Sequence, residues 1–180
     1  MDRFHAVRLP PDCARPDSPS AAFEVCRAIR TEVFVEGQAI ALEEEFDGLD
    51  QRAEHFLVSD APHRPGSTPP EPRHEGIVDR GLGTARTRIV GNAIRVERMA
   101  VRERARRRGV GRALLDAIEA AAREAGYRTL WLHAQVQAIP FYEKLGYRAD
   151  GPVFVEAGID HRRMEKRLTR PRRGPTAEGA

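Results

Sequence analysis

One stretch of the sequence, residues 95–126, restricts the fold most, because it joins a buried strand, a glycine turn and a helix. Residues 96–101 form a mostly apolar run of strand length, and from Val110 onward apolar residues recur at helical spacing. The turn between them is rich in arginine and ends in Gly109 and Gly111. Such a turn directs backbone N–H groups and the positive end of the helix dipole at one point. We therefore predict that it binds an anion, typically a phosphate.

Two motifs in this order carry a resemblance to a known family. Arg106, Gly109 and Gly111 match Arg/Gln-x-x-Gly-x-Gly/Ala, and the segment resembles the acyl-CoA signature of the GNAT superfamily of N-acetyltransferases. Phe141-Tyr142-Glu-Lys-Leu-Gly-Tyr begins 35 residues after Arg106 and resembles the Phe-Tyr-x-x-x-Gly-Phe box of the same enzymes. The two boxes together indicate this family more strongly than either alone.

Three shorter stretches are similar to the ElaA-type subgroup of these enzymes. Val-Phe-Val-Glu36 precedes Gln38, although Gly37 intervenes where the subgroup has none. His-Ala-Gln135 reproduces the end of the fifth strand in the subgroup, where Gln135 replaces the asparagine that is usual elsewhere in the family. The stretch around His161 resembles the end of ElaA-type chains.

The order of predicted elements is also similar to the GNAT arrangement. Apolar patterns and turn residues predict strands at 4–9, 54–59, 84–90, 93–101, 129–134, 153–156 and 160–168, and helices at 21–34, 110–126 and 138–146. The predicted fold class is α+β: a mixed, mostly antiparallel sheet of six or seven strands flanked by helices and splayed between its fourth and fifth strands. We expect one domain over residues 1–168, a mobile loop at 60–81 and a disordered tail at 169–180.

Composition excludes several classes of protein. Charged residues make up 32% of the 180 residues, and no apolar run approaches the ~20 residues of a membrane span. The N-terminus lacks the layout of a signal peptide, so a cytoplasmic location is expected. Cys13 and Cys26 are not accompanied by histidines at metal-ligand spacing, so we interpret them as reduced thiols and expect no metal.

The resemblance implies that acetyl-CoA is the co-substrate. Backbone groups of the fourth strand would pair with the pantetheine arm as an added strand would, and main-chain N–H groups of the turn would hold the pyrophosphate. The residues assigned to the cofactor are Met99, Ala100, Val101, Arg106, Arg107, Arg108, Gly109, Val110, Gly111, Arg112, Gln135, Phe141 and Tyr142.

The resemblance also assigns the catalytic groups. Tyr142 would protonate the departing thiolate, a role that suits a phenol with a reference pKa near 10. Strand alternation places Arg95, Glu97 and Met99 on one face, and related enzymes often carry their base on this strand, so Glu97 is the candidate base. The alternatives are a structural Glu97, or a base supplied by an acidic cluster at 43–50, by His55, by His133 or by a relayed water.

The candidate residues of the acceptor pocket come from the stretches that are similar to the ElaA-type subgroup. Glu36, His55, His133 and His161 are its candidate residues. The acidic cluster at 43–50 is either solvated surface or a wall that attracts a cationic acceptor.

The resemblance thus implies an acetyl-CoA-dependent N-acetyltransferase. Neither box contains a cysteine, which favours direct transfer in a ternary complex over a covalent acetyl-enzyme. Its partner would be a small-molecule or peptide amine, with no nucleic acid or membrane, and the protein would be a monomer or homodimer. Two alternatives remain: a CoA-binding regulatory module without turnover, and an arginine-rich nucleic-acid-binding protein, whose positive field nearby acidic residues would weaken.

Overall fold

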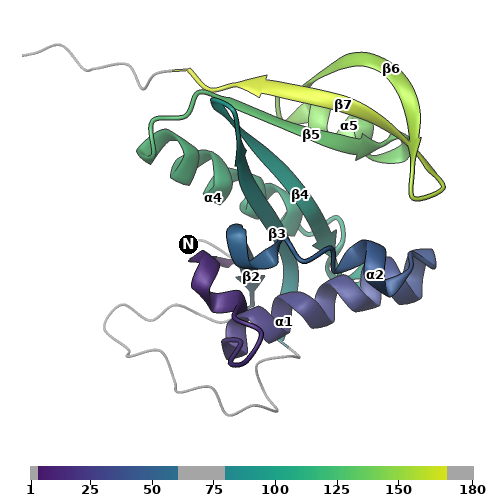
Figure 1. Ribbon diagram of the computed structural model, residues 1–180. Coiled ribbons are helices and arrows are strands. Elements are labelled where there is room, and N and C mark those ends of the chain that lie inside the picture. Colours follow the sequence, from purple (N-terminus) through teal and green to yellow (C-terminus); the bar gives the residue numbers. More distant parts are fainter. Residues whose placement is uncertain (1–3, 61–79, 170–180) are drawn as a thin grey trace, which may run out of the picture.

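The computed structural model describes residues 4–60 and 80–169. They form a seven-stranded sheet of order β1-β2-β3-β4-β5-β7-β6, with α1 and α4 on opposite sides of its first half (Figure 1). Pairing is antiparallel except between β4 and β5, which confirms the predicted α+β class and mixed sheet. The strands are β1 (His5–Leu9), β2 (Glu54–Ser59), β3 (Gly81–Val90), β4 (Ala93–Val101), β5 (Thr129–Gln135), β6 (Arg148–Glu156) and β7 (Ile159–Arg167), and the α-helices are α1 (Ala21–Arg30), α2 (Leu42–Glu45), α4 (Val110–Glu124) and α5 (Ile139–Lys144).

Most predicted elements are present, and the first helix shows the clearest difference. Ser20 caps α1, because its Oγ accepts a hydrogen bond from the N–H of Phe23 at 3.2 Å. The α-helix ends at Arg30, and the chain continues as a π-helical turn, η2 (Thr31–Glu36). The predicted loop 60–81 and tail 169–180 fall almost entirely outside the described residues.

Two hydrophobic clusters hold the helices against the sheet. Phe56 and Val58 of β2 pack with Leu114 of α4, whereas Leu57 packs with Ile29 of α1. Because successive side chains of β2 point to opposite faces of the sheet, α4 packs on one face and α1 on the other. Burial on both faces explains why β2 reads as a continuous apolar run.

The sheet splits between β4 and β5. β4 and β5 pair only through Ile94 with Leu130, Arg95 with Trp131 and Val96 with Leu132, although both strands continue beyond these pairs. Past Val96 the two strands diverge (Figure 1). The predicted splay between the fourth and fifth strands is therefore confirmed.

A bulge in β4 changes which side chains share a face. Arg98 has φ of 50°, and the register with β3 shifts beside it. Met99 consequently packs against the same cluster as Val96. The predicted common face of Arg95, Glu97 and Met99 is wrong, because strict alternation does not survive a bulge.

Among the residues that the structure describes, no helix is long and apolar enough to cross a membrane.

Candidate active site

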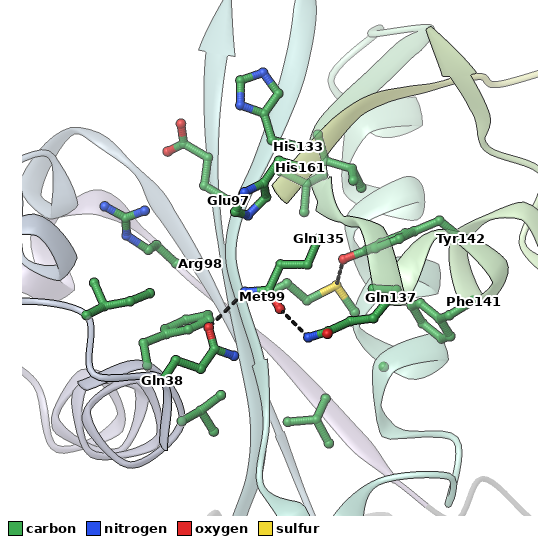
Figure 2. A pocket seen from close by; sticks show the side chains of 18 of the residues that line it. Gln38, Glu97, Arg98, Met99, His133, Gln135, Gln137, Phe141, Tyr142 and His161 are labelled. Carbon is green, nitrogen blue, oxygen red and sulfur yellow. Dashed lines mark hydrogen bonds between the residues drawn. The ribbon is translucent and has the colours of Figure 1, made fainter. Parts of the chain in front are cut away.

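A cavity of about 1050 Å³ occupies the split between β4 and β5 (Figure 2). One part of its wall is the glycine turn with the start of α4, and another is α5 with Phe141 and Tyr142. The remaining wall comes from the loop after η2, from β4 and from β5 to β7. The polar residues of that part are Gln38, Glu44, Glu45, Asp47, Arg95, Glu97, Arg98, His133, Gln135, Gln137, Glu156 and His161.

The glycine turn has the conformation that its sequence predicts. Gly109 has φ of 100°, which favours glycine, and no side chain caps α4. A Cβ on Gly111 would lie 3.0 Å from Cζ of Phe141, so the second glycine lets the helix approach α5 closely. The first N–H groups of α4 are thus directed at the cavity without a capping side chain, as an anion site requires.

Most of the predicted cofactor residues line this cavity, and two do not. Arg108 points away, because its guanidinium pairs with Asp60 at 3.2 Å and lies 5.9 Å from the ring centroid of Phe4. Ala100 is buried in the cluster of α1. The residues of the predicted set that do line it are Met99, Val101, Arg106, Arg107, Gly109, Val110, Gly111, Arg112, Gln135, Phe141 and Tyr142.

Tyr142 reaches the split from α5. Its hydroxyl donates to Sδ of Met99 at 3.4 Å, so the phenol meets β4 just beyond the last β4–β5 pair (Figure 2). Burial raises the pKa of Tyr142 well above its usual value. The hydroxyl therefore keeps its proton at neutral pH and can donate it.

Glu97 is surrounded by arginines. Its carboxylate accepts hydrogen bonds from Arg88 at 2.6 and 2.8 Å and pairs with Arg86 at 3.0 Å and with Arg95 at 2.8 Å. Burial alone would raise the pKa of Glu97, but the Arg88 hydrogen bonds and the neighbouring positive charges bring it below its usual value. A carboxylate stabilised in this way is a weak proton acceptor, so the geometry argues against Glu97 as the base and favours the structural alternative.

Two of the predicted acceptor residues lie outside the cavity wall. His55 is fully buried, stacks edge-on against Phe23 with ring centroids 4.7 Å apart, and has Nε2 3.0 Å from the carbonyl oxygen of Asp50. Burial lowers the pKa of His55, as expected of a core histidine. Glu36 is exposed at the end of η2, and Gln38 lines the cavity in its place.

His133 and His161 do line the cavity, from β5 and β7. Nδ1 of His133 lies 2.8 Å from the carboxylate of Glu156. Gln135 donates to Gln38 at 2.8 Å, which joins β5 to the loop after η2 (Figure 2). The structure thus brings the two histidines together with the glycine turn and the tyrosine box.

The acidic cluster at 43–50 is only partly surface. Glu45 is buried and pairs with Arg30 at 2.5 Å and with Arg98 at 3.1 Å. Arg86 pairs with Asp47 at 2.7 Å and with Asp50 at 3.1 Å. The cluster is therefore held against the sheet by arginines from α1, β3 and β4.

Several residues of the cavity were missed by sequence reasoning. Gln38 lies in the Val-Phe-Val-Glu pattern and could have been included. No sequence pattern marks the other three residues as part of the cavity. Arg98 reaches it through a bulge, Gln137 through the turn η6 (Val136–Ala138), and Glu156 through the pairing of β6 with β7.

Neither cysteine belongs to the cavity wall. Cys13 and Cys26 are free thiols packed in the cluster of α1. Burial raises the pKa of Cys13 to about 11 and that of Cys26 to about 12, so both thiols stay protonated at neutral pH. Within the described part of the chain, no group of three or more candidate metal ligands occurs.

Residues 77–168 match the family described as the acetyltransferase (GNAT) domain, which covers the glycine turn, the tyrosine box and most of the cavity. The chain belongs to the GNAT acetyltransferases. Two Bacillus subtilis relatives of this GNAT protein are an uncharacterised N-acetyltransferase, YjcF, and the uncharacterised protein YyaT. YjcF is 35% identical over 139 residues, 77% of this chain and 87% of its own length. YyaT is 34% identical over 145 residues, 79% of this chain and 86% of its own length.

Solved structures show the same fold. A crystal structure named as an N-acetyltransferase of Lactobacillus plantarum is 26% identical, has a TM-score of 0.74 and covers 93% of this GNAT chain and 100% of its own. Escherichia coli ElaA is 19% identical, has a TM-score of 0.67 and covers 91% of this chain and 99% of its own. The likeness to ElaA concerns the fold, and it agrees with the similarity of the sequence patterns.

Proposed function

We propose that this protein is an N-acetyltransferase that transfers the acetyl group of acetyl-CoA directly to a primary amine. The observation that carries the proposal is the contact of the Tyr142 hydroxyl with Met99 at the split of the sheet, in the same cavity as the uncapped start of α4. The proposal therefore assigns the acid and the anion site to the wall of one cavity. Family membership supports acyl transfer, and the buried thiols disfavour a covalent acetyl-enzyme.

The residues of the cavity have separate roles in this proposal. Backbone groups of β4 beyond Val96 have no partner strand on the β5 side, so an extended pantetheine arm can pair with them. N–H groups at the start of α4, with Arg106 and Arg107, hold the pyrophosphate. Tyr142 then supplies a proton to the sulfur that leaves when the amine attacks the thioester carbon.

Ligand binding is tested by thermal unfolding with acetyl-CoA, with ATP and single-stranded DNA as controls. Acetyl-CoA at 100 times its dissociation constant stabilises the protein by about 2.7 kcal/mol and raises the midpoint by several degrees. A shift produced by DNA and not by acetyl-CoA would contradict the proposal and favour a nucleic-acid-binding protein.

A pair of glycine variants tests the anion site. Gly109→Ala and Gly91→Ala both force alanine into positive φ, and neither Cβ meets an atom closer than 3.6 Å. Each is expected to cost roughly 1–2 kcal/mol of stability. Only Gly109→Ala should weaken acetyl-CoA binding, by about tenfold or more, because Gly91 lies in the β3–β4 hairpin away from the cavity. Equal affinities of the two variants would exclude the turn as the phosphate site.

Turnover is tested by following the free thiol of CoA with glucosamine, spermidine, lysine and a lysine-containing peptide as acceptors. We expect thiol release with at least one of them and none without an amine. Acetyl-CoA binding without thiol release from any acceptor would favour the regulatory CoA-binding module instead.

A further inference from the structure

The reaction needs a group that accepts a proton from the amine, and the described site leaves this role open. A lysine-like amine is almost fully protonated at pH 7, and its neutral form costs roughly 4–5 kcal/mol there. Glu97, held by three arginines, does not suit the role. The proton must therefore go to another group of the cavity wall, one with a free lone pair.

His161 lies beside the split, beyond the last pair of β4 and β5. Val96 and Leu132 form the last pair of β4 and β5, and Met99 and Gln135 each lie three residues beyond it on the two sides of the split. His161 of β7 is the register partner of Gln135, so the two side chains are neighbours on one face of the sheet. His133 lies two residues back along β5, closer to the closed end of the split.

The two ring nitrogens of His161 have different environments. Nδ1 lies 2.8 Å from the carbonyl oxygen of Ile159, and because a carbonyl only accepts, Nδ1 carries the hydrogen. The ring also stacks on Phe154, with centroids 6.2 Å apart. Nε2 has no hydrogen-bond partner among the described residues, and His161 belongs to the cavity wall (Figure 2). A neutral His161 thus presents a lone pair on Nε2.

The other charged groups near His161 are already engaged. From β5 and β6, His133 and Glu156 pair with each other, and Arg95 of β4 lies 3.9 Å from Glu156. The remaining charged side chains of this part of the cavity wall are Glu97 and Arg98 of β4, Glu44 and Glu45 of α2, and Asp47 shortly after α2. Arg163 of β7 lies outside the wall, and its guanidinium stacks on Trp131. Of these, Glu45, Asp47, Glu97 and Arg98 form ion pairs with one another or with neighbouring arginines.

We infer that Nε2 of His161 is the proton acceptor for the amine, an inference that rests on the proposed acetyl transfer. The ammonium loses one proton to Nε2, and the neutral nitrogen then forms the C–N bond as the C–S bond breaks. Tyr142 protonates the leaving sulfur and regains a proton from the amine nitrogen, which loses its second proton. The imidazolium releases its proton to water, so one H⁺ leaves per acetyl group transferred. An imidazole suits this cycle because one ring nitrogen can accept a proton while the other keeps its hydrogen bond.

The test compares His161→Gln with His133→Gln and with His5→Gln, a matched control on β1 that is not part of the cavity wall. The acceptor is the primary alkylamine of the panel with the fastest turnover. At pH 7, His161→Gln should lower kcat/KM by about 10²–10⁴-fold with an unchanged thermal shift by acetyl-CoA. His5→Gln should behave like the unmodified protein.

The pH dependence separates a proton acceptor from a structural residue. As the pH rises toward 9.5 the free amine becomes more abundant, so the loss caused by His161→Gln should shrink by more than about tenfold. A loss that stays constant across this range would overturn the inference. The inference would also be overturned if His133→Gln showed a pH-dependent loss of kcat/KM while His161→Gln kept the rate of the unmodified protein.

A second measurement does not depend on turnover. ¹⁵N NMR of the imidazole nitrogens reports the neutral tautomer, which is expected to carry its hydrogen on Nδ1 of His161 in the unmodified protein. An Nε2–H tautomer would overturn the inference even if the enzyme is active. Absence of thiol release in the unmodified protein would instead refute the proposed function, and the histidine would then have no proton to accept.

Discussion

At the scale of single residues, the cavity is built around a buried phenol and a thioether. Tyr142 is packed edge-on between Phe141 and Tyr147, with ring centroids 5.0 and 5.8 Å away. Within residues 4–60 and 80–169, the one acceptor of its hydroxyl is the sulfur of Met99, which is a weak acceptor. A leaving thiolate would be a much stronger acceptor, so the hydroxyl gains its best partner only during the reaction.

Tyr142→Phe should therefore reduce kcat by about 10²-fold while the dissociation constant of acetyl-CoA and the unfolding midpoint stay nearly unchanged. The reduction of kcat comes from the missing proton donor to the sulfur, because phenylalanine keeps the ring and its packing. Tyr147→Phe is the matched control, because Tyr147 is also buried and lies outside the cavity wall. A kcat within twofold of the unmodified value for Tyr142→Phe would remove the tyrosine from the mechanism.

At the scale of elements, the bulge of β4 connects the sheet to the short helix α2. Arg98 extends from the bulge and donates to the carbonyl oxygens of Glu44 and Glu45 at 2.7 and 3.1 Å, and to Asp47 at 3.2 Å. Without the bulge this position would point to the opposite face of the strand. Arg98 therefore helps to hold α2 and the loop after it against β4, on the side of the cavity where we propose that the amine binds.

Arg98→Ala is expected to lower stability by about 1.5–3 kcal/mol, because it removes charge-assisted hydrogen bonds and leaves Glu45 with fewer partners. It should also raise the KM of the amine more than that of acetyl-CoA. The reason is that α2 borders the part of the cavity proposed for the amine and not the glycine turn proposed for the cofactor. Arg15→Ala, which removes an exposed pair with Asp12, is the control and should change neither KM. Equal increases in both KM values would show that the bulge does not position the acceptor side selectively.

At the scale of the whole molecule, a network of ion pairs joins elements from both halves of the chain. Arg30 of α1 and Arg86 of β3 share Asp50, at 2.8 and 3.1 Å. Arg86 continues the network to Glu97 of β4, and Arg98 closes it through Asp47. Such a network holds α1, α2, β3 and β4 in one arrangement around the cavity.

This network makes stability depend on pH. Burial would raise the pKa values of Asp47, Asp50 and Glu97, but hydrogen bonds and charges of the arginines bring all three below their usual values. Their contribution is complete above the unfolded-state pKa near 4 and is lost as the pH falls through the lower folded-state values. Burial lowers the pKa of His55, so His55 adds a loss of stability that begins as the pH falls below about 6.5. Burial raises the pKa of Glu45, so Glu45 has the opposite effect and gains stability as the pH falls.

We therefore expect the free energy of unfolding, measured with urea, to fall as the pH is lowered from 7 to 3. Asp47→Asn should make this fall shallower below pH 4 than in the unmodified protein, because the substituted side chain no longer titrates there. Asp12→Asn, at an exposed site, is the control. An unchanged slope in Asp47→Asn would contradict a role of this carboxylate in acid sensitivity.

The sequence by itself determined the features that local chemistry sets. Gly109 and Gly111 between a strand and a helix specify the turn, and the pattern around Tyr142 specifies a short helix with a phenol on it. Apolar alternation was sufficient for β2, whose predicted bounds agree with the structure. These features depend on neighbours in the sequence, whose spacing a single chain displays directly.

Only the tertiary structure decided which polar side chains meet. Glu97 was predicted as a base from strand alternation, and Arg86 and Arg88 from the adjacent strand stabilise its charge instead. His55 was predicted for the acceptor pocket and is buried against Phe23, whereas His161 came to the split through its pairing with β5. The electrostatic environment of a titratable group is set by residues that are close in space and distant in sequence, so the fold had to be known before the candidate proton acceptors could be compared.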